Sequence, residues 1–147
     1  MENGLTDFSH DDGLPPQVPD FDLLRKIGEG GFGQVWLGRN RTTGRFRAVK
    51  LIALRVVGRA DPAGREVVSL THLEARVKSD HPHLLAIHHV GKTDEHLFYV
   101  MDLADDAAGA GEPSDPGYRP ATLEDRLAQG PLQAEECLRS ARQLLAG

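Results

Sequence analysis

The sequence predicts an α+β fold in which a small antiparallel sheet is covered by one helix and followed by two further helices. A glycine-rich stretch at residues 28–33 lies between two apolar segments, which indicates a hairpin. Three more short segments, residues 46–52, 83–91 and 95–101, have the composition of strands. Residues 65–79 place apolar side chains near the helical period. With 147 residues, of which 39% are hydrophobic, the chain is long enough for one domain with one core.

The glycine-rich stretch reads "IGEGGFGQV", with glycines spaced G-x-G-x-x-G, and this spacing alone fits several nucleotide-binding folds. A dinucleotide-binding turn leads straight into a helix, whereas Val35, Trp36 and Gly38 favour a strand here. A P-loop requires a lysine after its last glycine, and Gln34 stands at that position. The remaining interpretation is a glycine loop that joins two antiparallel strands.

The rest of the sheet and the helix expected to cover it are predicted from residues that favour turns or end helices. Residues 40–45 are polar and contain a glycine, so they are predicted to turn the chain into a third strand at residues 46–52. Lys50 lies on that strand, in a sheet whose first hairpin would cover a ligand. The covering helix is predicted to end near Pro82, because the residue before a proline is disfavoured in the α region. Two further strands then complete the sheet.

The run "LLRKIGEGGFGQVWLG", followed by "TGRFRAVKLI", resembles the first three strands of a protein kinase. In that family a G-x-G-x-x-G-x-V loop precedes an A-V-K lysine, and here the glycines, Val35, Ala48 and Lys50 fall at compatible intervals. The strings "VWLG" and "YVMDLADD" are most similar to bacterial serine/threonine kinases of the eukaryotic type. The resemblance implies a protein-kinase-like N-lobe, a five-stranded antiparallel sheet with one covering helix, followed by two helices of an incomplete C-lobe.

Composition and the resemblance together divide the chain into four parts. Residues 1–19 are acidic and proline-rich, and are expected to form a flexible tail. Residues 20–104 correspond to the kinase N-lobe and hinge, and residues 105–120, rich in Gly, Ala, Asp and Pro, are expected to be a linker. Residues 121–147 correspond to the truncated start of the C-lobe. There Thr122 opens a predicted capping box, and the last helix is expected to expose an apolar stripe.

By resemblance, this part of a kinase binds ATP. Lys50 would be the cation for the α and β phosphates, and a carboxylate on the covering helix would orient it. Glu66 is the favoured residue for that carboxylate, and Glu74, two turns later, is the alternative. Val35 and Ala48 would supply apolar walls for the adenine. Lys50 and Glu66 are therefore the expected catalytic pair.

The end of the last strand would form the rim of the adenine site. Met101 sits where the family has its gatekeeper, and Asp102, Leu103 and Ala104 would be the hinge whose backbone groups pair with the adenine edge. The residues expected to contact the nucleotide are Ile27, Gly28, Glu29, Gly30, Gly31, Phe32, Gly33, Gln34, Val35, Ala48, Lys50, Met101, Asp102 and Ala104.

Two motifs of the family do not occur in the sequence. H-R-D-x-x-x-x-N supplies the catalytic base and a metal ligand, D-F-G supplies the main Mg²⁺ ligand, and neither string is present. Mg²⁺ and a protein substrate are therefore expected only in the complete enzyme, and the chain is expected to be inactive alone. The alternative is a non-catalytic kinase-like module that binds a nucleotide or another protein.

Charge and cysteine content exclude several other classes of protein. The net charge is −5 and the basic residues are scattered, so neither nucleic acid nor an anionic membrane is an expected partner. Cys137 is the only cysteine, which excludes an intramolecular disulfide and fits a reducing cytoplasm. No run of 18 apolar residues predicts a membrane span. No metal site is expected, because the histidines lack zinc-site spacing; they include His81, His83, His88 and His89.

Overall fold

The structure of the protein is a computed structural model, which describes residues 14–30, 33–54, 82–83, 85–109 and 111–146. The predicted covering helix at residues 65–79 lies outside the described residues.

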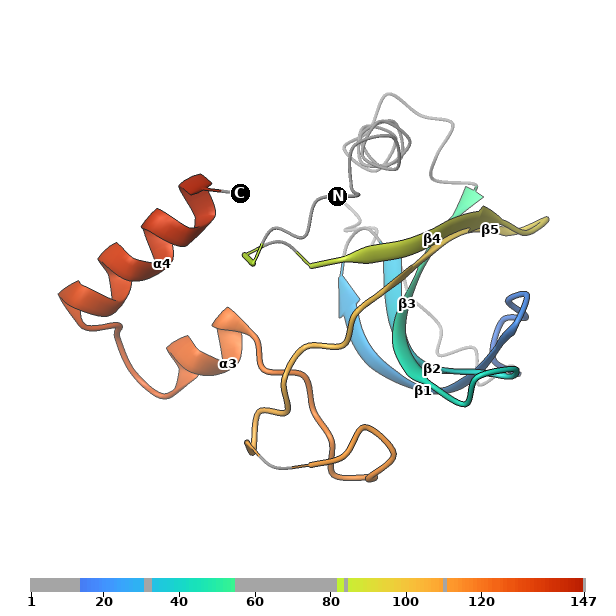
Figure 1. Ribbon diagram of the computed structural model, residues 1–147, viewed down its shortest axis with the longest axis horizontal. Helices are drawn as coiled ribbons and strands as arrows, with labels where there is room; N and C mark the ends of the chain where they lie inside the picture. Colours follow the sequence, from blue (N-terminus) through green and yellow to red (C-terminus); the bar gives the residue numbers. More distant parts are fainter. Residues whose placement is uncertain (1–13, 31–32, 55–81, 84, 110, 147) are drawn as a thin grey trace, which may run out of the picture.

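Five strands form one antiparallel sheet, as the sequence predicts (Figure 1). They are β1 (Phe21–Gly30), β2 (Gly33–Asn40), β3 (Phe46–Ala53), β4 (Ile87–Lys92) and β5 (His96–Met101). Their order across the sheet is β1-β2-β3-β5-β4, so β3 lies at the centre and β1 and β4 form the edges. Asn40 shapes the turn between β2 and β3, because its Oδ1 accepts the backbone N–H groups of Thr42 (3.1 Å) and Thr43 (2.8 Å).

Strand alternation gives the sheet two faces, each with its own apolar cluster. We call the face that carries Val49 the outer face and the face that carries Lys50 the inner face. The inner-face cluster consists of Ile52, Leu97 and Tyr99, with Leu54, Ile87, Val90 and Met101 packed against it. The outer-face cluster consists of Val18, Phe21, Leu23, Val49, Leu51, Phe98 and Val100, with Trp36 packed against it.

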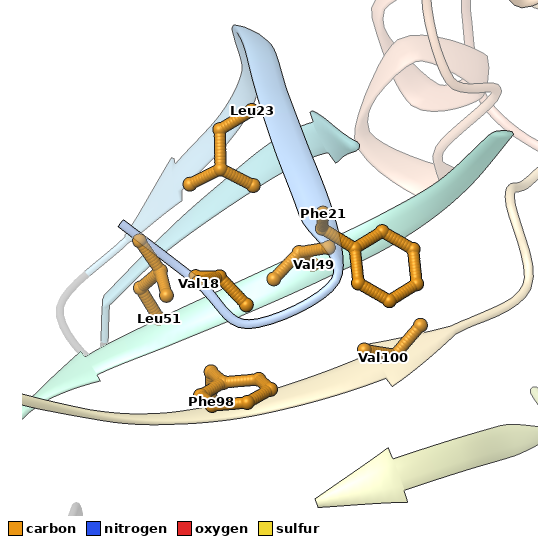
Figure 2. Packing of buried hydrophobic residues seen from close by; sticks show 7 residues of the cluster. All are labelled: Val18, Phe21, Leu23, Val49, Leu51, Phe98 and Val100. Carbon is orange, nitrogen blue, oxygen red and sulfur yellow. The ribbon is translucent and has the colours of Figure 1, made fainter. Parts of the chain in front are cut away.

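Val18 belongs to the outer-face cluster although the sequence places it in the flexible tail. Figure 2 shows its side chain under β1, directed toward the same space as Leu51 and Phe98. It is only 2% exposed and forms an isolated β-bridge with Phe21. The tail prediction is therefore wrong at Val18. A single apolar residue after two prolines has no periodic signal, but it covers apolar surface that the sheet would otherwise expose to water.

Two helices follow the sheet, α3 (Leu123–Ala128) and α4 (Ala134–Ala146), and both lie to the left of the sheet in Figure 1. The predicted capping box is half formed. Thr122 Oγ1 accepts the backbone N–H of Asp125 (3.1 Å), but its hydroxyl then donates to Asp125 Oδ2 (2.6 Å) in place of the second backbone bond. Neither helix, within the part of the chain that is described, combines the length and the hydrophobicity needed to cross a bilayer.

A paired contact joins the two helices. The guanidinium of Arg126 donates from Nε and Nη2 to the two carboxylate oxygens of Glu136, at 2.9 and 2.7 Å. This bond holds the pKa of Glu136 below its usual value. The apolar stripe of α4 is exposed, as the sequence predicts, and contains Leu138, Leu144 and Leu145.

Residues 105–109 and 111–120, which we call the hinge loop, are folded where the sequence predicts a linker at residues 105–120. A bridge pairs Asp106 with Pro120, and the backbone N–H of Ala107 donates to the carbonyl of Arg119 at 2.7 Å. The carboxylate of Asp106 accepts the backbone N–H groups of Arg119 and Gly111, both at 3.0 Å. One acidic side chain thus satisfies amides that a longer strand pairing would otherwise satisfy, and a composition typical of linkers does not reveal it.

Candidate active site

Lys50 lies on the central strand, β3, between a branched neighbour on β2 and an aromatic neighbour on β5. It is paired with Val35 of β2 on one side and with Tyr99 of β5 on the other. Residues directly opposite each other in antiparallel strands point to the same face, so all three side chains belong to the inner face. The ammonium Nζ of Lys50 is 5.6 Å from the centroid of the Tyr99 ring, which is within the range of a cation–π interaction.

The glycine hairpin extends the pairing of Lys50 and Val35 to the edge strand, β1. Gly28 of β1 is paired with Val35, so Gly28, Val35 and Lys50 form one cross-strand row on the inner face. Gln34 lies within β2, and no helix begins there. The prediction that the glycine loop joins two antiparallel strands is therefore confirmed, and the ammonium of Lys50 is on the same face as Gly28.

The glycines of the hairpin differ in what the fold requires of them. At Gly33, φ is 139° and an added Cβ would lie 2.1 Å from the carbonyl oxygen of Leu51, so no side chain fits. At Gly28 an added Cβ would make an ordinary 3.6 Å contact with Val35, and at Gly30 it would meet nothing within 4 Å. The fold therefore leaves room for side chains at positions 28 and 30. Their absence keeps the end of the hairpin open to a ligand.

A second row of inner-face residues runs beside the first. Leu37 is paired with Ala48, and Ala48 is paired with Met101 at the end of β5. Ala48 is buried, and its short side chain lies between two longer ones. Val35, Ala48 and Met101, the expected apolar contacts of the adenine, therefore share one face of the sheet.

Glu29 and Gln34 use their side chains on the opposite face. Gln34 Nε2 donates to Glu29 Oε1 (3.2 Å), and Gln34 Oε1 accepts the indole N–H of Trp36 (3.2 Å), which packs on the outer-face cluster. Lys26 Nζ also donates to Glu29 Oε2 at 3.0 Å. The bond between Gln34 and Glu29 ties β1 to β2 behind the hairpin. Any contact of Glu29 or Gln34 with a ligand on the inner face would come from their backbone.

The segment after β5 is held from two sides. The backbone N–H of Asp102 donates to the carbonyl of Ala86 (3.0 Å), and its carboxylate oxygen Oδ1 lies 2.6 Å from His88 Nε2. Two residues further on, the carbonyl of Ala104 accepts the hydroxyl of Tyr118 at 2.9 Å. The expected hinge is therefore connected to β4 and to the hinge loop.

Several predicted site residues lie outside the described residues, namely Gly31, Phe32, Glu66 and Glu74. The expected pair of Lys50 with Glu66 therefore stays a prediction. Ile27 is described, and it lies at an irregularity in the pairing of β1 between Lys26 and Gly28.

The sequence reasoning overlooked three residues near the site: Tyr99, Arg25 and Tyr118. Tyr99 could have been found by pairing the strands, because "FYVM" places it opposite Lys50. Tyr118 had only a weak signal, a single aromatic residue in a polar, proline-rich segment.

The fold and this arrangement define the smaller lobe of a protein kinase, with two helices after it. The family model of the protein kinase domain matches residues 21–147. The chain therefore belongs to the protein kinase family, as its resemblance at the level of short motifs predicts.

The chain is also similar to several kinases, among them serine/threonine kinases. It is 35% identical to the serine/threonine-protein kinase Sgk3 of Rattus norvegicus over 61% of its length, which is 18% of that protein. It is 36% identical to the RAC-beta serine/threonine-protein kinase of Homo sapiens over 58% of its length, or 17% of that protein. For Protein kinase 3 of Dictyostelium discoideum the identity is 34% over 58% of this chain and 9% of that protein. The chain thus matches less than a fifth of each of these relatives.

Proposed function

We propose that the inner face binds ATP and that the chain is the ATP-binding portion of a serine/threonine protein kinase. The complete enzyme would transfer the γ-phosphate of ATP to a hydroxyl group of a protein. The observation that carries this proposal is the row formed by Gly28, Val35 and Lys50, which brings a glycine hairpin and an ammonium group to one face. The printed names of Sgk3 and RAC-beta support the choice of serine/threonine over tyrosine.

Lys50 would balance the charge of the phosphates. Two unit charges about 4 Å apart at an effective dielectric constant near 20 attract each other by about 4 kcal/mol, before the cost of desolvation is subtracted. The ring of Tyr99 limits where the ammonium can go, since it faces Nζ at 5.6 Å. Glu66 is our proposed partner for orienting the ammonium, with Glu74 as the alternative.

The hairpin and the hinge would hold the rest of the nucleotide. Without side chains at positions 28 and 30, backbone N–H groups of the hairpin can approach phosphate oxygens closely. Val35 and Ala48 would form a dry wall against the adenine, and Met101 would limit the depth of the site. Backbone groups of Asp102 and Ala104 would pair with the adenine edge.

Catalysis needs groups that the sequence does not contain. The base of H-R-D and the metal-binding aspartate of D-F-G are both missing from these 147 residues. We therefore propose that Mg²⁺ and the acceptor hydroxyl are held by other residues of the complete enzyme, and that this chain alone does not transfer phosphate. A cytoplasmic location also remains a prediction, based on the single Cys137.

Titration with ATP tests the nucleotide site directly. We expect Lys50→Met to weaken ATP binding at least tenfold, which corresponds to about 1.4 kcal/mol. Lys92→Met is the matched control, because Lys92 is an exposed strand lysine at the far end of β4. ATP affinity should be measured by calorimetry at the natural length of the protein. Equal affinities for the wild type and the Lys50 variant would refute the role of Lys50.

The missing catalytic motifs also favour a second candidate, a kinase-like module that binds a nucleotide or a protein without catalysis. A phosphotransfer assay on a general protein substrate separates the two candidates. Transfer by the protein at its natural length that is lost in Lys50→Met supports the kinase, whereas nucleotide binding without any transfer supports the module.

A further inference from the structure

The hinge loop follows the hinge and also contacts the first strand, β1. Tyr118 forms hydrogen bonds to both the hinge and β1. Its hydroxyl donates to the carbonyl of Ala104 at 2.9 Å, and its own carbonyl accepts Nη2 of Arg25 at 2.6 Å. The guanidinium carbon of Arg25 also lies 5.8 Å from the centroid of the Tyr118 ring. One residue thus joins the edge strand β1 to the segment that follows β5.

Arg25 reaches this contact from the row that contains the proposed adenine wall. It is paired with Leu37, which is paired in turn with Ala48, and Ala48 is paired with Met101. Arg25 therefore belongs to the inner face, at the edge of the same row. The hinge loop meets the sheet beside the proposed adenine site and not at a remote surface.

The hinge loop is braced internally as well. Tyr118 is 3% exposed, so its ring is one of the buried groups of the described chain. The carboxylate of Asp106 accepts the N–H groups of Arg119 and Gly111, and the bridge between Asp106 and Pro120 closes the base of the loop. A loop held in this way can resist a change in the distance between its two attachment points.

We propose that the hinge loop is a strap that fixes the hinge relative to β1, and that Tyr118 is a positioning residue for adenine nucleotides. The inference rests on the proposed ATP site. The adenine would bind between the inner face of β1 to β3 and the hinge, so the two Tyr118 bonds set the width of that slot before the nucleotide arrives. When the slot already has the width that the bound nucleotide requires, the protein loses less conformational entropy on binding. The affinity for the nucleotide is therefore higher.

Two substitutions remove the two attachments separately. Tyr118→Phe keeps the ring and removes the hydroxyl that binds Ala104, and Arg25→Met removes the guanidinium while keeping an apolar stem. Arg41→Met is the control, because Arg41 likewise donates to a backbone carbonyl, that of Phe21 (3.3 Å), and to Asp22 Oδ1 (2.7 Å), and neither acceptor belongs to the hinge loop. Thermal unfolding of each variant verifies that it is folded.

Two measurements on the protein at its natural length test the strap. Hydrogen exchange of the backbone amides at residues 102–107 reports on the hinge without any nucleotide, and calorimetry gives the ATP and ADP dissociation constants. We expect both variants to exchange faster at the hinge and to bind ATP and ADP about 2- to 10-fold more weakly, the range that corresponds to one net hydrogen bond. The double variant should lose less than the product of the two single losses, since both act through Tyr118. Arg41→Met should match the wild type.

The outcomes separate the strap from the nucleotide site. Unchanged hinge exchange in both Tyr118→Phe and Arg25→Met would overturn the strap, whatever the nucleotide affinity is. Faster exchange with unchanged ATP affinity would overturn the positioning role of Tyr118. A wild type that binds neither ATP nor ADP would overturn the proposed function, while the hinge exchange still decides whether the strap exists.

Discussion

Gly33 is the glycine of the hairpin that the fold itself requires, and Gly33→Ala tests that distinction. Its φ of 139° is a conformation that residues with side chains rarely adopt. Holding such a residue in an unfavourable backbone region costs on the order of 1–3 kcal/mol. The added Cβ would also lie 2.1 Å from the carbonyl oxygen of Leu51, so β2 or β3 must move to relieve the clash.

We therefore expect Gly33→Ala to lower the free energy of unfolding by at least about 1–3 kcal/mol. For a domain of this size the midpoint of thermal unfolding should fall by about 3–10 °C. Circular dichroism during thermal and urea unfolding measures both quantities. The variant should lose stability whether or not ATP is present.

Gly28→Ala and Gly30→Ala are the controls, since a methyl group has room at both positions. Their stability should stay within about 0.5 kcal/mol of the wild type, as expected for substitutions that break no contact. Their ATP affinity should fall, because the methyl group would occupy space proposed for the phosphates. The reasoning fails if Gly33→Ala is as stable as the wild type, or if Gly30→Ala is equally destabilised.

Two further predictions concern parts of the fold that the sequence did not reveal. Burial, followed by the nearby carboxylates of Asp106 and Asp105, raises the pKa of Tyr118 above its ordinary value of 10.0, although Arg25 acts in the opposite direction. The unfolded chain then loses this proton at a lower pH than the folded chain does. Stability should therefore be full below pH 10 and fall as the pH rises through the raised pKa, and urea unfolding of Tyr118→Phe should lack this part of the fall. Val18→Ala removes two buried methyl groups and should destabilise the protein by about 1–2 kcal/mol, measured by urea unfolding, whereas no loss would show that Val18 does not stabilise the outer-face cluster.

The sheet and the position of Lys50 could be predicted because each rests on local signals. Glycine spacing, a polar turn at residues 40–45 and short apolar segments each mark one element. Once three strands are antiparallel, alternation decides which side chains share a face. Alternation puts Ala48 and Lys50 on one face, but the row of Gly28, Val35 and Lys50 also depends on the register and on the irregularity between Lys26 and Gly28, which no local signal predicts.

The contributions of Val18 and Tyr118 could not be predicted, because both depend on contacts distant in the sequence. The carbonyl of Tyr118 accepts a hydrogen bond from Arg25, 93 positions away, and no periodic pattern in the sequence predicts such a pair. Val18 is a single apolar residue, and it is buried only because it packs against the outer face of the assembled sheet. Glycine, alanine, aspartate and proline in the hinge loop indicate only that regular helix or strand is absent.

The order of the strands also gives the site a gradient of mechanical stiffness. β3 is bonded on both sides and lies two strands from either edge, so its backbone should be among the last to open spontaneously. The ammonium is therefore anchored to the stiffest strand, while the glycines belong to a hairpin whose outer strand has a neighbour on one side only. A bound ligand could thus bend the glycine hairpin toward itself while the ammonium group of Lys50 stays in position.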